Sequence, residues 1–572
     1  MKKIVFLSAL LLLCVVMVMA VPAYRGAVQM RQPDGSYITL QLHGDEWMNF
    51  RTTSDGFSVV KNHRGYYVYA QQKNGRLEAT QHVAHDVAER SVSENKWLND
   101  VQKWQVPAIP ENVMQLRAAE YKRRSAAINR RRAGGYDYQK FRGLVILVEF
   151  KDRSFSRSDY KQVVTDMLCK ANYKGYDNTR YGKFTGSVRD YFVDNTNGLF
   201  EPTFDVVGPV KVDYSQYVPH KTDSIDCINY EALKKASTLT DYSKFDTDKD
   251  GVVDMVFFLY AGLGSNYGDN DERLVWPHAS TVVYEGGPVT FDGVTMGPYA
   301  CSTELYGSED NNILDGIGTF CHEFSHVLGL PDLYDTDYES NGGESNHPDK
   351  WSVMAGGCYE NLARTPVGYS LYERYSLGFI TPEVINSEGS KRLNPLPLFN
   401  KGYRINTEVP KEFFLLENRQ PSLFKWDAYL PGHGLLVFRV DSTNTMIWDY
   451  NMVNANPKHN YFVMIRAGGG KDASGSDPFP GSKEVTELDI YTKPANLLTW
   501  AGKKTQWGIY NIVEQGNIIR FEVREPKAPD GIILPKADAK SGNTQMFNLA
   551  GQRVNKDFKG LVIKNGKKFL VK

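Results

Sequence analysis

Residues 320–332 read FCHEFSHVLGLPD and contain the pattern His-Glu-x-x-His between His322 and His326. A helix turns by about 100° per residue, so it places these two histidines about 40° apart on one face. The opposite face carries an apolar stripe that begins upstream of the motif. The stripe consists of Ile313, Leu314, Ile317, Cys321, Phe324 and Leu328. The pattern predicts a buried helix that presents two imidazoles to a cleft.

Two imidazoles one helical turn apart can bind one Zn²⁺ ion at about 2.0–2.1 Å. Glu323, beside the first histidine, can act as general base toward a water on that metal. Gly329 can end the helix in a left-handed conformation, which places Asp332 to supply a third, oxygen ligand. Three protein ligands leave a fourth position for water, as a catalytic zinc requires. A more distant glutamate, Glu344, is the alternative third ligand.

Further stretches extend the pattern around this motif. Residues 351–357, WSVMAGG, form a tight turn, and Met354 in it is predicted to lie beneath the metal. Together these stretches resemble the immune inhibitor A family of secreted bacterial metalloproteases, in the metzincin group. The segments that carry the resemblance are 42–46, 185–192, 322–335, 352–357, 417–420, 430–432 and 434–436.

The resemblance implies a zinc-dependent endopeptidase that is made as a proenzyme and hydrolyses proteins or peptides. It implies His322, His326 and Asp332 as zinc ligands and Glu323 as the base. It also implies a metzincin-like α/β (α+β) fold for the catalytic domain.

The chain divides into regions of different pattern downstream of residue 132. Aliphatic runs at 144–148 and 252–261, mixed with helical patterns, predict an α/β (α+β) catalytic domain over 133–385. Short strands with Gly, Pro and Asn turns predict a β-sandwich-like domain over 386–525.

The first 20 residues are typical of a signal peptide. Two lysines precede about 16 apolar residues, and Ala20 stands at the last position before a plausible cleavage site, with Ala23 as the alternative. No other stretch approaches the ~20 apolar residues of a membrane span. The sequence therefore predicts a secreted or cell-surface protein with no transmembrane segment in the mature chain.

A prosegment is predicted over residues 21–132. It combines a β-rich unit at 24–80 with a basic stretch that holds two candidate activation sites, Arg124 and Arg132. Because residues 21–132 contain no cysteine, no prosegment thiolate can block a metal. Latency must use a carboxylate, for which Asp45 and Glu46 are candidates, another ligand, or steric cover.

The last 47 residues, 526–572, predict a small β-module with two short apolar strands. This tail resembles the C-terminal sorting domain of type IX secretion cargo. The resemblance implies recognition by a secretion machinery and passage across an outer membrane. Its residues are Asn548, Leu549, Gly551, Gln552, Val554, Gly560, Gly566, Lys567 and Val571.

A second metal site is predicted at residues 246–254. Asp246, Asp248, Asp250 and Asp254 occupy positions 1, 3, 5 and 9 of a loop with glycine at position 6. This spacing can wrap several oxygens around one Ca²⁺ ion. Position 12 is Phe257 rather than glutamate, so the loop is no EF-hand. The prediction is a structural calcium ion, and the alternative is an acidic turn before a strand.

Charge is divided unevenly along the chain. The 67 basic and 67 acidic residues cancel overall, but residues 1–132 carry a net +8, residues 526–572 a net +7 and the remainder a net −15. An acidic body between two basic ends argues against nucleic acid as a partner. The alternative to an enzyme is a calcium-stabilised surface adhesin with a vestigial metal site.

Overall fold

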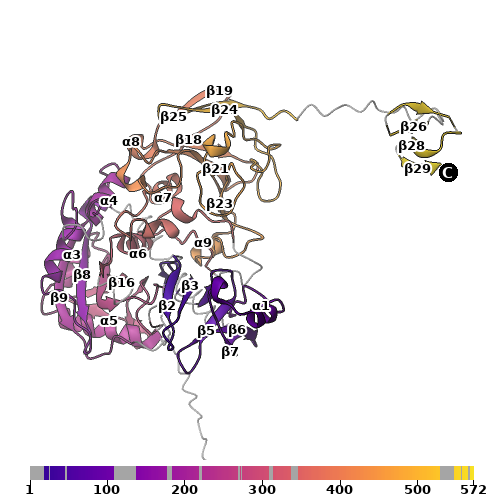
Figure 1. The fold of residues 1–572 in the computed structure, drawn as a ribbon. Coiled ribbons are helices and arrows are strands. Elements are labelled where there is room, and N and C mark those ends of the chain that lie inside the picture. The colour runs from indigo at the N-terminus through magenta and orange to yellow at the C-terminus, as the bar shows by residue number, and fades with distance from the viewer. Residues whose placement is uncertain are drawn as a thin grey trace, which may run out of the picture. The chain divides into compact units, whose positions relative to one another are not determined.

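Two compact units make up the chain in the computed structural model, one over Met1–Pro526 and one over Lys527–Lys572 (Figure 1). Among the described residues, no helix is both long enough and apolar enough to span a bilayer. The structure describes residues 19–24, 26–45, 48–108, 137–176, 183–217, 222–267, 271, 273–307, 313–336, 345–528, 546–549, 551–555, 557–564 and 567–571.

A mixed seven-stranded sheet forms the centre of the first unit, with strand order β1-β11-β16-β10-β8-β9 and β17 paired to β16. The neighbours β16, β10, β8 and β9 run parallel, whereas β11 and β1 add antiparallel strands at one edge. The strands are β1 (Met19–Ala20), β8 (Arg142–Glu149), β9 (Thr203–Lys211), β10 (Val256–Leu263), β11 (His278–Thr281), β16 (Pro298–Tyr306) and β17 (Ile313–Leu314).

Helices cover both faces of this sheet, because its central strands are apolar on both sides. On one face, Val145 and Leu147 of β8 pack in a core with α3 (Tyr160–Cys169), α4 (Val188–Asn195) and α6 (Gly318–Leu328). On the other face, alternate residues of β8 pack against α5 (Thr222–Ala236). The fold of this region is mixed α/β, as the sequence predicts. Two short hairpins accompany the sheet: β12 (Val283–Tyr284) with β13 (Gly287–Pro288), and β14 (Thr290–Phe291) with β15 (Val294–Thr295).

The motif helix α6 begins later than the apolar stripe predicts. Ile313 and Leu314 form β17, and the helix begins at Gly318. A Cβ atom at Gly318 would lie 1.9 Å from the Cys358 carbonyl oxygen, so the first turn is fixed by close packing against another segment. The helix ends as predicted, at Gly329, which has a φ of 121°.

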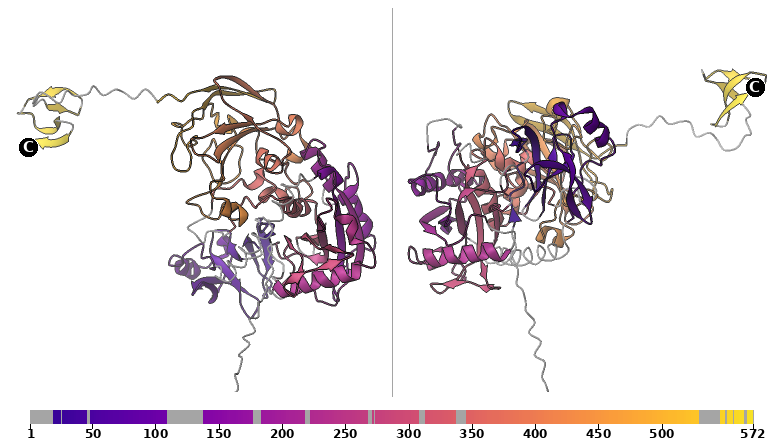
Figure 2. Two further views of the ribbon diagram at one scale, coloured as in Figure 1. Left: turned by 180° about the vertical axis from the view of Figure 1, so that it is seen from behind. Right: turned by 60° about the horizontal axis from the view of Figure 1, so that its bottom comes forward.

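The N-terminal region forms a six-stranded antiparallel sheet in sequence order. Buried and partly buried residues alternate along β3, which is typical of a sheet with one face on a core. The sheet (indigo) lies next to the region of the central mixed sheet in both views of Figure 2, and Met48 and Phe50 share a buried cluster with Tyr334. The elements are β2 (Val28–Arg31), β3 (Tyr37–Gly44), β4 (Asn49–Thr53), β5 (Ser58–Lys61), β6 (Tyr67–Lys73), β7 (Arg76–Val83) and α1 (Val92–Leu98).

The region after residue 376 contains two sheets that share one apolar core. Phe414 and Leu416 of β21 face the smaller sheet, whereas Phe413 and Leu415 belong to the core that contains the motif helix. The larger sheet is therefore packed on both sides. Its strands are β18 (Glu383–Val384), β20 (Tyr403–Asn406), β21 (Glu412–Arg419), β22 (Gly434–Asp441) and β23 (Phe462–Met464), and the smaller sheet has β19 (Gly389–Leu393), β25 (Ile518–Arg524) and β24 (Gly508–Gln515). Helix α7 (Leu371–Ser376) precedes these sheets, and α8 (Leu396–Phe399) and α9 (Thr445–Asp449) lie between their strands in the sequence.

The second unit is a four-stranded antiparallel sheet with strand order β27-β26-β28-β29. It includes both short strands that the sequence predicts. The strands are β26 (Met546–Asn548), β27 (Arg553–Val554), β28 (Gly560–Lys564) and β29 (Lys567–Val571).

Candidate metal centre

Three side chains converge in a fully buried group at the motif helix. The Nε2 atoms of His322 and His326 are 3.1 Å apart, and each lies 3.2 Å from Oδ1 of Asp332. A tetrahedral zinc ion with ligands at 2.0–2.2 Å separates those ligand atoms by about 3.3 Å. The three atoms thus have the spacing that one small cation imposes.

Backbone carbonyls fix the protonation of both imidazoles. Nδ1 of His322 lies 2.7 Å from the Val353 carbonyl oxygen, and Nδ1 of His326 lies 2.8 Å from the Leu330 carbonyl oxygen. A carbonyl can only accept, so each Nδ1 carries the proton and each Nε2 offers a lone pair. Oδ1 of Asp332 has no hydrogen-bond partner among the described residues. Lone pairs on three buried atoms face one another, an arrangement that a divalent cation stabilises, so the donor set fits zinc.

The aspartate is oriented by Asn451, a residue 119 positions downstream. The Asp332 N–H donates to Oδ1 of Asn451, and Nδ2 of Asn451 donates to Oδ2 of Asp332, each over 2.5 Å. Because this reciprocal pair of hydrogen bonds holds Oδ2, Oδ1 of Asp332 points toward the two imidazoles. Asn454 supports the same segment by donating to the Leu333 carbonyl over 2.8 Å. Motif reasoning missed Asn451, because the asparagine-rich stretch around it signals only turns.

The predicted methionine turn lies against the motif helix. Met354 is fully buried in the main core. Its N–H donates to Oγ of Ser352, and that hydroxyl donates to Oε1 of Glu373 over 2.5 Å. The carbonyl of the preceding residue, Val353, accepts a hydrogen bond from Nδ1 of His322. The turn therefore holds one imidazole of the triad in place.

A strand from the N-terminal region crosses this centre. Glu323 is fully buried, and its Oε1 accepts the Val21 N–H over 2.7 Å. Just upstream, β1 pairs antiparallel with β11, with Ala20 opposite His278. Downstream, Tyr24 donates its N–H to the Asn266 carbonyl over 3.0 Å. Residues 19–20 therefore add an edge strand to the sheet, and residues 21–24 continue from it as a bound segment. Strand addition of this kind is a known mode of peptide recognition.

Of the two carboxylates considered for latency, Asp45 accepts the Met48 N–H at Oδ1 over 3.1 Å, and Glu46 lies outside the described residues. The main chain at Val21 does reach Glu323. Glu344, Arg124 and Arg132 also lie outside the described residues.

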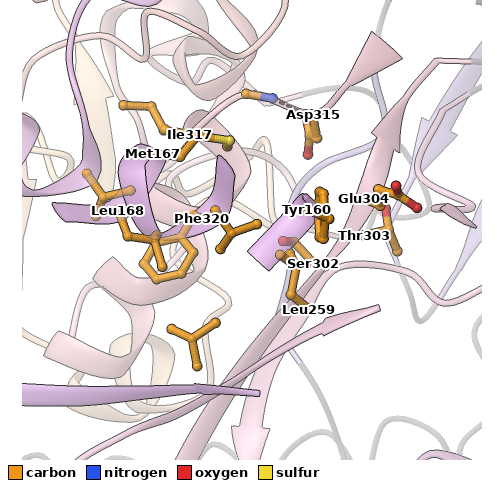
Figure 3. A pocket seen from close by; sticks show the side chains of 14 residues that line it. Tyr160, Met167, Leu168, Leu259, Ser302, Thr303, Glu304, Asp315, Ile317 and Phe320 are labelled. Carbon is orange, nitrogen blue, oxygen red and sulfur yellow. Dashed lines mark hydrogen bonds between the residues drawn. The ribbon is translucent and has the colours of Figure 1, made fainter. Parts of the chain in front are cut away.

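A small cavity of about 20 Å³ lies beside the first turn of α6; most of its lining is apolar, and Asp315, Glu304 and Ser302 contribute polar groups (Figure 3). A cavity holds one water from about 10–15 Å³ upward, so this space suits a single water rather than a substrate. Burial raises the pKa of Asp315 to about 6, although its carboxylate accepts hydrogen bonds from Tyr267 and Gly316. Burial likewise raises the pKa of Glu304.

The acidic loop brings three of its four predicted ligands together. Asp246, Asp248 and Asp250 each offer one oxygen, and these atoms lie within 4.8 Å of one another. Asp254 lies outside that group, and its Oδ2 accepts both the N–H and the hydroxyl of Thr247.

A glutamate beside a His-His-Asp group, on a helix that packs against a mixed sheet, defines a candidate metallopeptidase centre. Residues 133–374 match the family model of the immune inhibitor A peptidase M6, catalytic domain. This match confirms the resemblance to the immune inhibitor A family for the segments that lie within residues 133–374.

Two curated relatives match parts of the chain. Immune inhibitor A of Bacillus thuringiensis subsp. alesti is 33% identical over 132 residues, which cover 21% of this chain and 18% of the relative. The pre-pro-metalloprotease PrtV of Vibrio cholerae serotype O1 (strain M66-2) is 25% identical over 186 residues, which cover 31% of this chain and 19% of the relative. The matches thus span about a fifth of each relative's length.

Proposed function

We propose that this protein is a secreted zinc-dependent endopeptidase that is made as a proenzyme. The observation that carries the proposal is the buried group of two imidazole nitrogens and one carboxylate oxygen at 3.1–3.2 Å from one another. His322, His326 and Asp332 would hold the zinc ion. When bound, zinc polarises the scissile carbonyl and makes a water more acidic.

Glu323 would serve as the general base. It neighbours His322 on α6, and its Oε1 lies 2.7 Å from a backbone nitrogen of the strand that crosses the centre. Glu323 would accept a proton from the attacking water and return it to the nitrogen of the leaving amine. The carboxylate already lies within hydrogen-bond distance of a peptide nitrogen, as this second step requires.

The helix, the turn at Gly329 and the methionine turn at Met354 support a metzincin-like catalytic domain. The two sheets that share a core support a β-sandwich-like domain after it. We further propose export through the N-terminal signal peptide. The second unit would act as a sorting module for a secretion machinery.

The strand across the centre supports latency by occupation of the cleft. If a signal peptidase cuts after Ala20, Val21 becomes the new N-terminus and its α-amino group lies at the position of the present N–H. A protonated amine bonds a carboxylate more strongly than an amide N–H does. The new terminus would therefore remain on Glu323 and keep the base from its water.

The full chain should hydrolyse peptides weakly until it is cut within the basic stretch that contains Arg124 and Arg132. A tethered strand acts at a millimolar effective concentration, so we expect about a 100-fold gain after cleavage. Rates on a quenched fluorescent peptide would be compared before and after limited trypsin treatment. A zinc chelator should abolish the gain, and added Zn²⁺ should restore it. Cleavage without any gain would exclude a proenzyme, and a gain insensitive to chelator would exclude the zinc mechanism.

We also propose a structural calcium ion at Asp246, Asp248 and Asp250. Ca²⁺ at about 100 times its Kd stabilises a protein by about 2.7 kcal/mol, which corresponds to a Tm increase of roughly 5 °C or more. Calcium would be added to calcium-free, zinc-loaded protein during thermal unfolding. The variant Asp248→Asn/Asp250→Asn, altered at two exposed side chains, should show no increase. An unchanged Tm in the unaltered protein would leave the loop as an acidic turn.

A further inference from the structure

We propose that the catalytic region binds substrates on the leaving-group side through Trp276, Tyr359 and Asn266, and that it favours an aromatic side chain four residues after the scissile bond. The aromatic subsite consists of Tyr267, Tyr306 and Tyr359. This inference rests on the proposed peptidase function. We use the bound segment 21–24 as a guide to the path of a substrate strand.

The position of Val21 sets the numbering of the subsites. A general base returns its proton to the nitrogen of the leaving amine, which belongs to the first residue after the scissile bond. The Val21 nitrogen lies 2.7 Å from Oε1 of Glu323. Val21 therefore stands at the first leaving-group position, and Tyr24 stands at the fourth.

Catalytic-region side chains bind the main chain of this strand. Nε1 of Trp276 donates to the Val21 carbonyl over 2.9 Å, and the Tyr359 hydroxyl donates to the Pro22 carbonyl over 2.6 Å. Nδ2 of Asn266 donates to the same hydroxyl over 3.1 Å, and the Asn266 carbonyl accepts the Tyr24 N–H. These contacts involve no side chain of the strand, so a strand of another sequence can make them. The contact with the Asn266 carbonyl requires an N–H at the fourth position.

The side chain of Tyr24 lies among three tyrosine rings. Its ring centroid is 5.8 Å from that of Tyr267, 5.9 Å from that of Tyr306 and 5.5 Å from that of Tyr359. Tilted and edge-on contacts at these distances are favourable for aromatic pairs. The Tyr267 hydroxyl donates to Asp315, which fixes that ring from behind.

The side chain at the fourth position lies in a cluster that the matched domain forms without the prosegment sheet. Val21 and Ala23 pack in a cluster that includes Leu42 of the prosegment sheet, so their surroundings would change when the prosegment leaves. The cluster around Tyr24 is different, because its buried members are Tyr267, Tyr306, Ile313 and Ala363, all from the matched domain. An aromatic subsite therefore remains after activation.

The test uses enzyme obtained by cutting the full chain, with quenched peptides of sequence Ala-Ala-Val-Ala-Ala-X cut before valine. We expect kcat/KM to be roughly tenfold higher with X as tyrosine than with X as alanine. Tyr306→Leu should bring this ratio close to one. Tyr359→Phe keeps the ring but loses the hydroxyl, so it should lower kcat/KM for both peptides and leave the ratio unchanged. Tyr429→Leu, at an exposed tyrosine elsewhere, is the matched control.

The outcomes separate this inference from the function on which it rests. If zinc-loaded, processed enzyme cuts neither peptide nor casein, the peptidase function is wrong. If it cuts both peptides equally well, or if Tyr306→Leu retains the preference, the aromatic subsite is wrong. If Tyr359→Phe leaves both rates unchanged, its hydroxyl does not bind the substrate main chain.

Discussion

Glu323→Gln should remove nearly all peptide hydrolysis while the protein keeps its fold and its zinc. Glutamine cannot accept a proton, and a positioned general base contributes about 10²–10⁴-fold to a rate. The amide has nearly the shape of the fully buried carboxylate, and its oxygen can still accept the Val21 N–H. Prosegment docking should therefore persist, so the variant isolates the chemical step. Hydrolysis of casein and of a fluorescent peptide by the processed enzyme measures the loss.

The control for this variant is Glu383→Gln, which alters a glutamate that forms an ion pair with Lys401 at the surface. It should keep its activity. Zinc content and Tm should match the unaltered protein in both variants. Near-normal casein cleavage by Glu323→Gln would exclude Glu323 as the base.

The grouping of His322, His326 and Asp332 was predictable because it is local in sequence. Two histidines four residues apart, with a glycine that turns the chain back to Asp332, specify most of a ligand set within eleven residues. The start of the helix was not predictable in the same way. Ile313 and Leu314 fit a helical stripe and a short strand equally well. Packing of Gly318 against the Cys358 carbonyl decides between the two, and no local pattern records that contact.

The surroundings of the centre depend on contacts between residues far apart in the chain. Asn451 reaches Asp332 across 119 positions, Trp276 reaches Val21 across 255, and Val21 reaches Glu323 across 302. Each contact is made by a residue type that is common in turns or cores. Sequence reasoning could therefore name a carboxylate, another ligand or steric cover as routes to latency. It could not name the segment at Val21 that contacts Glu323.

Asp332→Ala should abolish tight zinc binding, whereas Glu344→Ala should leave it unchanged. Removing Asp332 takes away the charged ligand and leaves two imidazoles, whereas Glu344 is needed only if the alternative ligand set is correct. Zinc affinity would be measured by competition with a fluorescent chelator, which reads the site without relying on activity. Retained affinity in Asp332→Ala, with loss in Glu344→Ala, would reverse the assignment.

The zinc affinity of Asn451→Ala should lie between the affinities of Asp332→Ala and Glu344→Ala. The Asn451 variant removes the amide that holds Oδ2 of Asp332 over 2.5 Å, but it keeps all three proposed ligands. Loss of such an orienting partner typically weakens metal binding by 10–100-fold. Asn456→Ala, at an exposed position in the same loop, should bind zinc normally and shows whether any effect comes from the loop itself. A normal affinity in Asn451→Ala would mean that Asp332 is held by its own main chain. The region after residue 385 would then contribute packing to the centre but no orientation of its ligand.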